Sequence, residues 1–152
     1  MPVPPHVRRL RQLVGHELLL LPSVSVLPRD DDGRVLLVRH ADDGRWGTIG
    51  GAVEVDESPA EAAAREANEE AGVDVVLGPI LAALGGPDFH VVYPNGDRTA
   101  YVAVVYDATM TGGTPAPDGD ETLEVDWHPI GGLATLELTP FARATFAALG
   151  WL

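Results

Sequence analysis

The chain has 152 residues, of which 45% are hydrophobic, so we expect one domain with a single core. It has no cysteine, which excludes disulfide bonds and thiolate metal sites. Its net charge of −13 argues against nucleic acid and anionic membranes as partners, because both are also negative. For the same reason, a phosphate-rich ligand would need metal ions between itself and the protein. We expect the domain to occupy residues 1–152, with a helix in residues 1–16 leading into it.

The first part of the chain predicts a short helix and then two strands. Residues 4–15 start with prolines, place apolar side chains at helical spacing and end in glycine. Residues 17–27 and 34–40 are apolar and flank an acidic turn, a pattern that predicts a β-hairpin. The first of these stretches follows several arginines, as in a signal peptide, but Pro22 interrupts it and no small-residue cleavage site follows. It is also too short to span a membrane, so we expect a buried strand and a cytoplasmic protein.

The middle of the chain predicts a glycine-rich loop, a short strand and a helix of about four turns. The loop covers residues 41–50 and leads into a strand over residues 52–55. Ser58 can cap the helix as the first member of a capping box, and a proline follows it in the first turn. Gly72 is placed to end the helix.

Three glutamates share one face of this helix, because successive residues are about 100° apart around the axis. They are Glu66, Glu69 and Glu70. Their mutual repulsion would be reversed by Mg²⁺, which prefers oxygen ligands. A solvated acidic face would account for the three glutamates alone, but here Arg65, an upstream Glu57 and a glycine turn accompany them. Four alanines lie on the opposite side, and we expect them to pack on a sheet and hold the glutamates outward: Ala60, Ala64, Ala67 and Ala71.

The remaining sequence predicts further strands and a closing helix. The Pro-Asn-Gly-Asp turn at positions 94–97 is typical of a β-hairpin. The expected elements are one or two strands over residues 73–84, strands over 89–93, 99–108 and 123–128, a loop over 110–121, and a helix over 139–150. Strands on both sides of a central helix predict an α/β fold with a mixed sheet covered on both faces.

Residues 51–73 resemble the signature of the Nudix (MutT-like) hydrolases, G-x5-E-x7-R-E-U-x-E-E-x-G-U, where U is a bulky apolar residue. Every fixed position matches, and the one departure is Ala67, where the family usually has Leu, Ile or Val. The resemblance implies an α/β/α sandwich with a mixed central sheet and the signature helix packed on it. Arg11 and Gly15 in the first helix, and the later segment 93–97, resemble the branch called ADP-ribose pyrophosphatase-like, a label that does not define the substrate.

The resemblance also implies an activity: metal-dependent hydrolysis of a nucleoside diphosphate linked to another moiety, with water attacking phosphorus. Mg²⁺ or Mn²⁺ would neutralise the phosphates, position them and activate the water. The implied metal ligands are Glu66, Glu69, Glu70 and the Gly50 carbonyl, with Glu57 supporting this shell or a second ion. The alternative is a non-catalytic nucleotide-binding or sensor domain of the same fold. Such proteins usually lose signature glutamates, and this chain keeps all of them.

The general base stays open at this stage. Glu66 or Glu69 could serve within the signature, next to Arg65, or else Asp120 or Glu121 in the later loop. That loop is equally compatible with a solvated turn.

Substrate contacts are also only candidates. Arg39, with His40 beside it at a strand end, could contact phosphate or be a surface strand end, and Arg98, after the hairpin turn, could contact phosphate or be only solvated. Four aromatic residues could stack a base but are more often core: Trp46, Phe89, Tyr93 and Tyr101. We expect a small-molecule nucleotide as substrate, a homodimer by resemblance to the family, and specificity set by the loops 41–46, 85–89 and 110–121.

Overall fold

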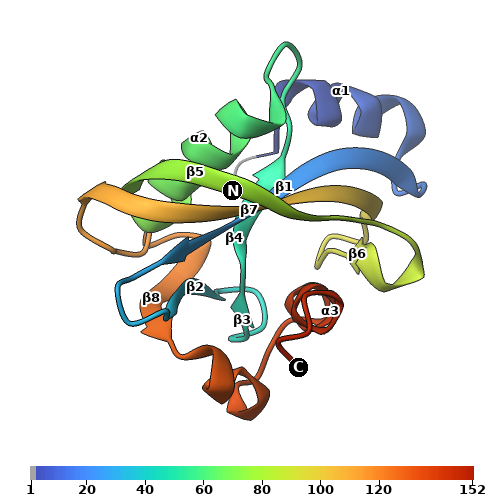
Figure 1. Cartoon of the computed structure of the whole chain (residues 1–152). Helices are drawn as coiled ribbons and strands as arrows, with labels where there is room; N and C mark the ends of the chain where they lie inside the picture. Colours follow the sequence, from blue (N-terminus) through green and yellow to red (C-terminus); the bar gives the residue numbers. More distant parts are fainter. Residues whose placement is uncertain (1–2) are drawn as a thin grey trace.

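A computed structural model describes residues 3–152 as one mixed eight-stranded sheet with helices on both faces (Figure 1). The main strand order is β3-β2-β1-β7-β5, while β4 pairs with β1, β6 with β7, and β8 with β2. The helices are α1 (Pro5–Val14), α2 (Pro59–Ala71) and α3 (Pro140–Ala148), with two 3-10 turns, η1 (Pro87–Phe89) and η2 (Ile130–Thr135). The strands are β1 (Leu19–Arg29), β2 (Val35–His40), β3 (Trp46–Gly47), β4 (Ile49–Ala52), β5 (Val73–Leu84), β6 (His90–Val92), β7 (Arg98–Gly113) and β8 (Thr122–His128). The predicted α/β class is confirmed.

The central strand is β1, which runs parallel to β7 and antiparallel to β4 and β2. Its residues 23–28 are all buried, because helices cover both faces of the sheet. One core cluster includes Val24 and Val26 and packs against α2, and the other includes Leu27 and packs against α3. No helix within residues 3–152 has the length and apolar character needed to cross a membrane.

Helix α2 begins and ends as predicted, but it buries a different face. The capping box of Ser58 and Glu61 is present, and Gly72 ends the helix in the left-handed conformation. The buried residues of α2 are Ala62, Ala63, Glu66, Ala67, Glu70 and Ala71, whereas Ala60 and Ala64 are exposed. The expectation that the alanines hold all three glutamates outward is therefore wrong. The small alanines let the helix lie close to β4, β1 and β5, and this turns two of the glutamates toward the sheet.

Several element boundaries also differ from the prediction. The short strand expected over residues 52–55 is β4, three residues earlier, where Gly50 and Gly51 pair with Ser25 and Val24 of β1. The sequence pattern missed it because the pairing depends on the absence of side chains: a Cβ on Gly50 would lie 2.1 Å from the Val24 carbonyl oxygen. Strand β7 continues to Gly113, and β5 stays one strand past Gly78-Pro79 through a shift in register.

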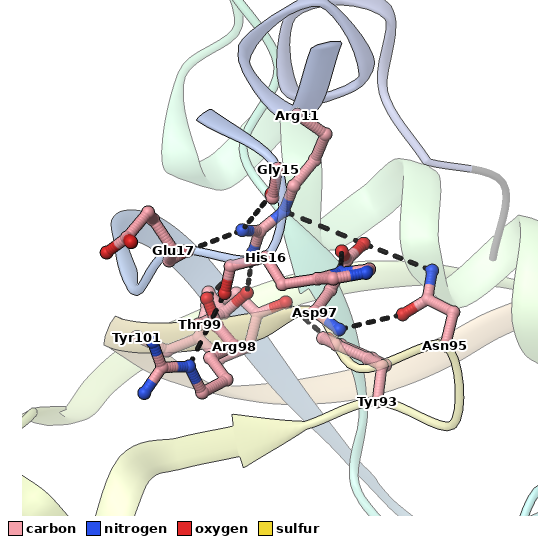
Figure 2. Close-up of polar contacts among 10 residues, drawn as sticks. All are labelled: Arg11, Gly15, His16, Glu17, Tyr93, Asn95, Asp97, Arg98, Thr99 and Tyr101. Carbon is pink, nitrogen blue, oxygen red and sulfur yellow. Dashed lines mark hydrogen bonds and ion pairs between the residues drawn. The ribbon is translucent and has the colours of Figure 1, made fainter. Parts of the chain in front are cut away.

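Helix α1 has no fully buried residue, and polar contacts join its C-terminal end to the rest of the domain (Figure 2). Arg11 donates hydrogen bonds to the carbonyls of Gly15, Glu17 and Arg98, and it forms an ion pair with Asp97 at 3.6 Å. The two segments that resemble the ADP-ribose pyrophosphatase-like branch therefore meet in space.

Candidate active site

Arg65 connects the carboxylates of α2 to the strand before it. Its Nε and Nη2 donate to the two oxygens of Glu57 at 2.7 and 2.9 Å. Its Nη1 donates to Glu66 at 2.9 Å and to Glu69 at 3.2 Å, and Nη2 also reaches the Ala52 carbonyl at 3.2 Å. These partners, Glu57 first, raise the pKa of Arg65, so it remains a fixed cation among the glutamates.

Glu57 accepts three hydrogen bonds in this arrangement. One of its oxygens also accepts the Glu54 backbone N–H at 3.1 Å, in addition to the bonds from Arg65. The hydrogen bond from Arg65 is the largest cause that lowers the pKa of Glu57. Glu57 thus orients Arg65, and three of the four acceptor positions of its carboxylate are used in this geometry.

Glu66 and Glu70 are the most unusual residues of the site, because both carboxylates are buried, with exposed fractions of 0% and 5%. No other residue donates a hydrogen bond to the Oε2 atom of either, although the two carboxyl groups can hydrogen-bond to each other when one holds a proton. Burial raises the pKa of Glu66 to about 7, and burial together with the charge of Glu66 raises the pKa of Glu70 well above its usual value. A buried carboxylate oxygen without a partner is costly, and a cation would remove that cost.

The surroundings of this pair fit a magnesium-type ion. The Gly50 backbone hydrogen-bonds to Glu70, which partly opposes the rise in its pKa and places Gly50 beside the carboxylates. Glu69 lies at the exposed edge and is bonded to Arg65. Within residues 3–152, no three acidic or histidine side chains form a complete metal cage.

The structure brings the later loop to the end of α2. Thr122 Oγ1 lies 3.4 Å from the Glu70 carbonyl oxygen, and the Glu121 carbonyl accepts the Ala41 N–H at 2.8 Å. Asp120 and Glu121, the candidate bases outside the signature, thus belong to a segment that packs against the helix carrying Glu70. The sequence analysis missed Thr122 and Asp118 of this segment, although the Asp-Gly-Asp-Glu-Thr run is a recognisable turn signal.

Of the residues expected near phosphate, Arg39 and His40 lie on the β2 end that meets this loop, whereas Arg98 is elsewhere. His40 is opposite Thr122 in the sheet, and burial lowers its pKa. Arg39 is ion-paired with Glu124 at 2.6 Å. Arg98 Nε donates to the His16 carbonyl, near the start of β1, about 20 Å along that strand from the residue that pairs with Gly50. The structure does not bring Arg98 to the glutamates.

The four aromatic residues considered for base stacking all have partners in the protein. Trp46 contacts His128 edge-on, and both Phe89 and Tyr101 contact Phe141 edge-on. The Tyr93 and Tyr101 hydroxyls are hydrogen-bonded to each other.

Comparison with known proteins shows the family to which this chain belongs. The sequence matches the NUDIX domain over residues 19–149, and the signature described above lies within that match. The chain belongs to the Nudix family. A MutT-like protein of Streptomyces ambofaciens is 35% identical over 105 residues, which are 69% of this chain and 61% of that relative, so the match leaves over a third of the relative uncovered.

Solved Nudix structures have the same fold. The MutT protein of Methanosarcina mazei superposes with a TM-score of 0.73 and 26% identity, covering 88% of this chain and 95% of that one. An ADP-ribose pyrophosphatase of Streptococcus suis superposes with a TM-score of 0.63 and 26% identity, covering 86% and 89%. The expected Nudix sandwich, with the signature helix packed on a mixed sheet, is confirmed.

Proposed function

We propose that this Nudix domain is a metal-dependent pyrophosphohydrolase acting on a nucleoside diphosphate linked to another moiety. One observation carries the proposal: Glu66 and Glu70 are buried side by side, and each keeps an oxygen without a partner. A divalent cation compensates such a pair, and a polyphosphate provides the remaining ligands. The net charge of −13 points the same way, because phosphates would be repelled without intervening metal ions.

In this proposal, Glu66, Glu70 and the Gly50 carbonyl hold Mg²⁺ or Mn²⁺, with Glu69 adding an oxygen at the exposed edge. The bound ion would neutralise phosphate oxygens and lower the pKa of a water molecule. Arg65, fixed by Glu57, keeps Glu66 and Glu69 in place. Glu121, Asp120, Glu66 and Glu69 remain the candidates for the base that removes a proton from the attacking water.

The substrate and setting are part of the same proposal. The name of the Streptococcus suis neighbour makes ADP-ribose the first compound to test here. Arg39 is the stronger of the two arginine candidates for phosphate contact, because it lies on the β2 end next to the Glu121 loop. A cytoplasmic location and a homodimer, both expected from the sequence, can be tested by fractionation and by sedimentation.

The test is release of phosphate or a nucleoside monophosphate from a substrate panel. It should include ADP-ribose, nucleotide sugars, CDP-alcohols, nucleoside triphosphates and oxidised dGTP. We expect turnover of at least one compound, loss of turnover with a chelator, and recovery with Mg²⁺ or Mn²⁺, because the ion carries the charge neutralisation. Turnover that resists chelation would contradict the proposal. Nucleotide binding without any turnover would instead identify the sensor alternative.

A further inference from the structure

We propose that Asp118 is a positioning residue, whose carboxylate shapes the 118–122 loop and sets Glu121 against the C-terminal end of α2. This inference rests on the proposed function, in which that loop holds two of the candidates for the base that removes a proton from the attacking water. It assigns a role to a residue outside the Nudix signature.

The Asp118 carboxylate gathers the donors of its own loop. Its Oδ1 atom accepts the backbone N–H groups of Asp120, Glu121 and Thr122 at 2.8, 2.9 and 3.0 Å. Three consecutive N–H groups directed at one oxygen fix the backbone of these residues. Hydrogen bonds to a carboxylate are stronger than those between neutral groups, so this small turn is held firmly. Glu121 is the middle one of these three donors.

Thr122 connects the turn to α2, the helix that carries Glu66 and Glu70. Its hydroxyl accepts the Asp118 N–H at 3.0 Å and lies within reach of two acceptors, Asp118 Oδ1 at 3.2 Å and the Glu70 carbonyl at 3.4 Å. A hydroxyl has one hydrogen to donate. Because Oδ1 already receives three N–H groups, that hydrogen is better used by the Glu70 carbonyl. Thr122 is 1% exposed, so this bond is shielded from water.

The loop also satisfies the end of α2 on its other side. The Ala116 N–H donates to the Ala71 carbonyl at 3.0 Å. The last carbonyls of a helix lack partners within the helix, and here the loop supplies partners to those of Glu70 and Ala71. Asp118 lies between these two attachment points. A loss of the Asp118 carboxylate would therefore remove three hydrogen bonds from the segment with Glu121, and the bond from the Ala41 N–H to the Glu121 carbonyl alone would not fix its position relative to Glu70.

The chain contains a matched control in Asp30. Its Oδ1 accepts the backbone N–H groups of Asp32 and Arg34 at 3.1 and 2.8 Å, so it organises a turn in the same way. That turn lies at the opposite end of β2 from His40, about 16 Å away. A purely structural role would make the two aspartates equivalent, whereas a positioning role would make only Asp118 matter for turnover.

The experiment compares Asp118→Ala, Asp118→Asn and Asp30→Ala in the full chain, using a substrate from the panel above with Mg²⁺. We expect Asp118→Ala to lower kcat by about tenfold or more with a small change in KM, as for a misplaced acid–base group. Asp118→Asn should recover most of kcat, because its amide oxygen accepts the same N–H groups. Asp30→Ala should keep kcat within about twofold of the wild type, even if its melting temperature falls as much as that of Asp118→Ala. An unchanged kcat in Asp118→Ala, no recovery in Asp118→Asn, or an equal loss in Asp30→Ala would each overturn the inference.

Amide hydrogen exchange separates this inference from the proposed function. Asp118→Ala should speed exchange of the Glu121 and Thr122 amides, and Asp30→Ala should not. Unchanged exchange in Asp118→Ala would overturn the inference even in an active enzyme. A wild-type protein that turns over no compound, but whose Asp118→Ala variant shows the faster exchange, would refute the proposed function and the catalytic role of the turn while confirming its geometry.

Discussion

At the scale of single residues, Glu66 and Glu70 are buried on the inner face of α2, yet each keeps one carboxylate oxygen without a hydrogen-bond partner. Without a metal ion the folded protein reduces this cost by holding protons, which is why burial raises the pKa of both groups. A metal ion must displace those protons, so metal affinity should rise with pH. The same two side chains thus link folding, protonation and metal binding.

The variant Glu70→Gln tests this link. Removing one charge relieves the buried pair, so the metal-free melting temperature should stay the same or rise slightly. An ion that binds only the folded state stabilises it by about 2.7 kcal/mol at a hundredfold excess over Kd, or roughly 5–10 °C for a chain of this size. Most of the rise in melting temperature that Mn²⁺ gives the wild type should be lost in the variant, together with most of its activity.

Glu61→Gln, at the exposed start of α2, is the control for a neutralised helix glutamate. A variant at position 70 that melts lower without metal, yet responds to Mn²⁺ normally, would make Glu70 structural.

The pH dependence of the same variant gives a second measurement. The unfolded chain loses these protons near pH 4.5, whereas folded Glu66 holds its proton to about pH 7. The folded state therefore binds more protons in this window, and its stability falls as pH rises through it. Metal-free wild type should lose roughly 2–3 kcal/mol between pH 5 and 8 through Glu66 alone, which corresponds to about 5–10 °C. Thermal melts should show a flatter profile for Glu70→Gln, and parallel profiles would contradict the assignment.

At the scale of elements, α2 and β4 form the site because their backbones approach closely. Alanines on the inner face of α2 let the helix lie close to β4, and Gly50 lets β4 lie close to β1. Gly50 is the tightest position, where an added Cβ would lie 2.1 Å from the Val24 oxygen and 3.1 Å from the Ser25 Cα. Both are backbone atoms of β1, so neither can move aside by a change of rotamer.

Gly50→Ala should therefore push β4 away from β1 and displace the carbonyl assigned to the metal ion. We expect a loss of about 1–3 kcal/mol of stability and a large loss of metal-dependent activity. Gly131→Ala is the matched control, because nothing lies within 4 Å of the Cβ that it would add. Thermal melts with and without Mn²⁺ would measure both effects. A Gly50→Ala protein with normal activity would exclude this carbonyl from the site.

At the scale of the whole molecule, α1 depends on one arginine for its position. The Arg11 guanidinium, 11% exposed, bridges the helix, the start of β1 and the β6–β7 hairpin (Figure 2). A ten-residue helix is only marginally stable alone in water, and α1 buries none of its residues. Val7 and Leu10 of α1 are only half-buried, so we expect the polar contacts at its C-terminal end to add much of what a fully buried face provides elsewhere.

Arg11→Met keeps much of the apolar stem and removes these contacts. The change should cost roughly 2 kcal/mol, the range for hydrogen bonds to a charged group, and lower the melting temperature by several degrees. It should also speed amide exchange in residues 5–14. Arg9→Met is the matched control on the exposed side of the same helix. Equal effects of the two changes would show that packing, and not Arg11, holds α1.

The sequence by itself determined the local features of this protein. The capping box, the hairpin turns, the spacing of the signature residues and the α/β class all depend on neighbours within a few positions, and each appears in the structure. Family membership followed from the same spacing. Helical periodicity correctly placed Glu66 and Glu70 on one face.

Only the tertiary structure decided which way that face points. Burial depends on what packs against a helix, and β4, β1 and β5 contact the side of α2 that carries Glu66 and Glu70. The same dependence on distant partners hid the pairing of Gly50 with β1, the attachment of the 118–122 loop to the end of α2, and the separation of Arg98 from the glutamates. These contacts join residues far apart in the chain, and a sequence pattern carries no measure of such distances.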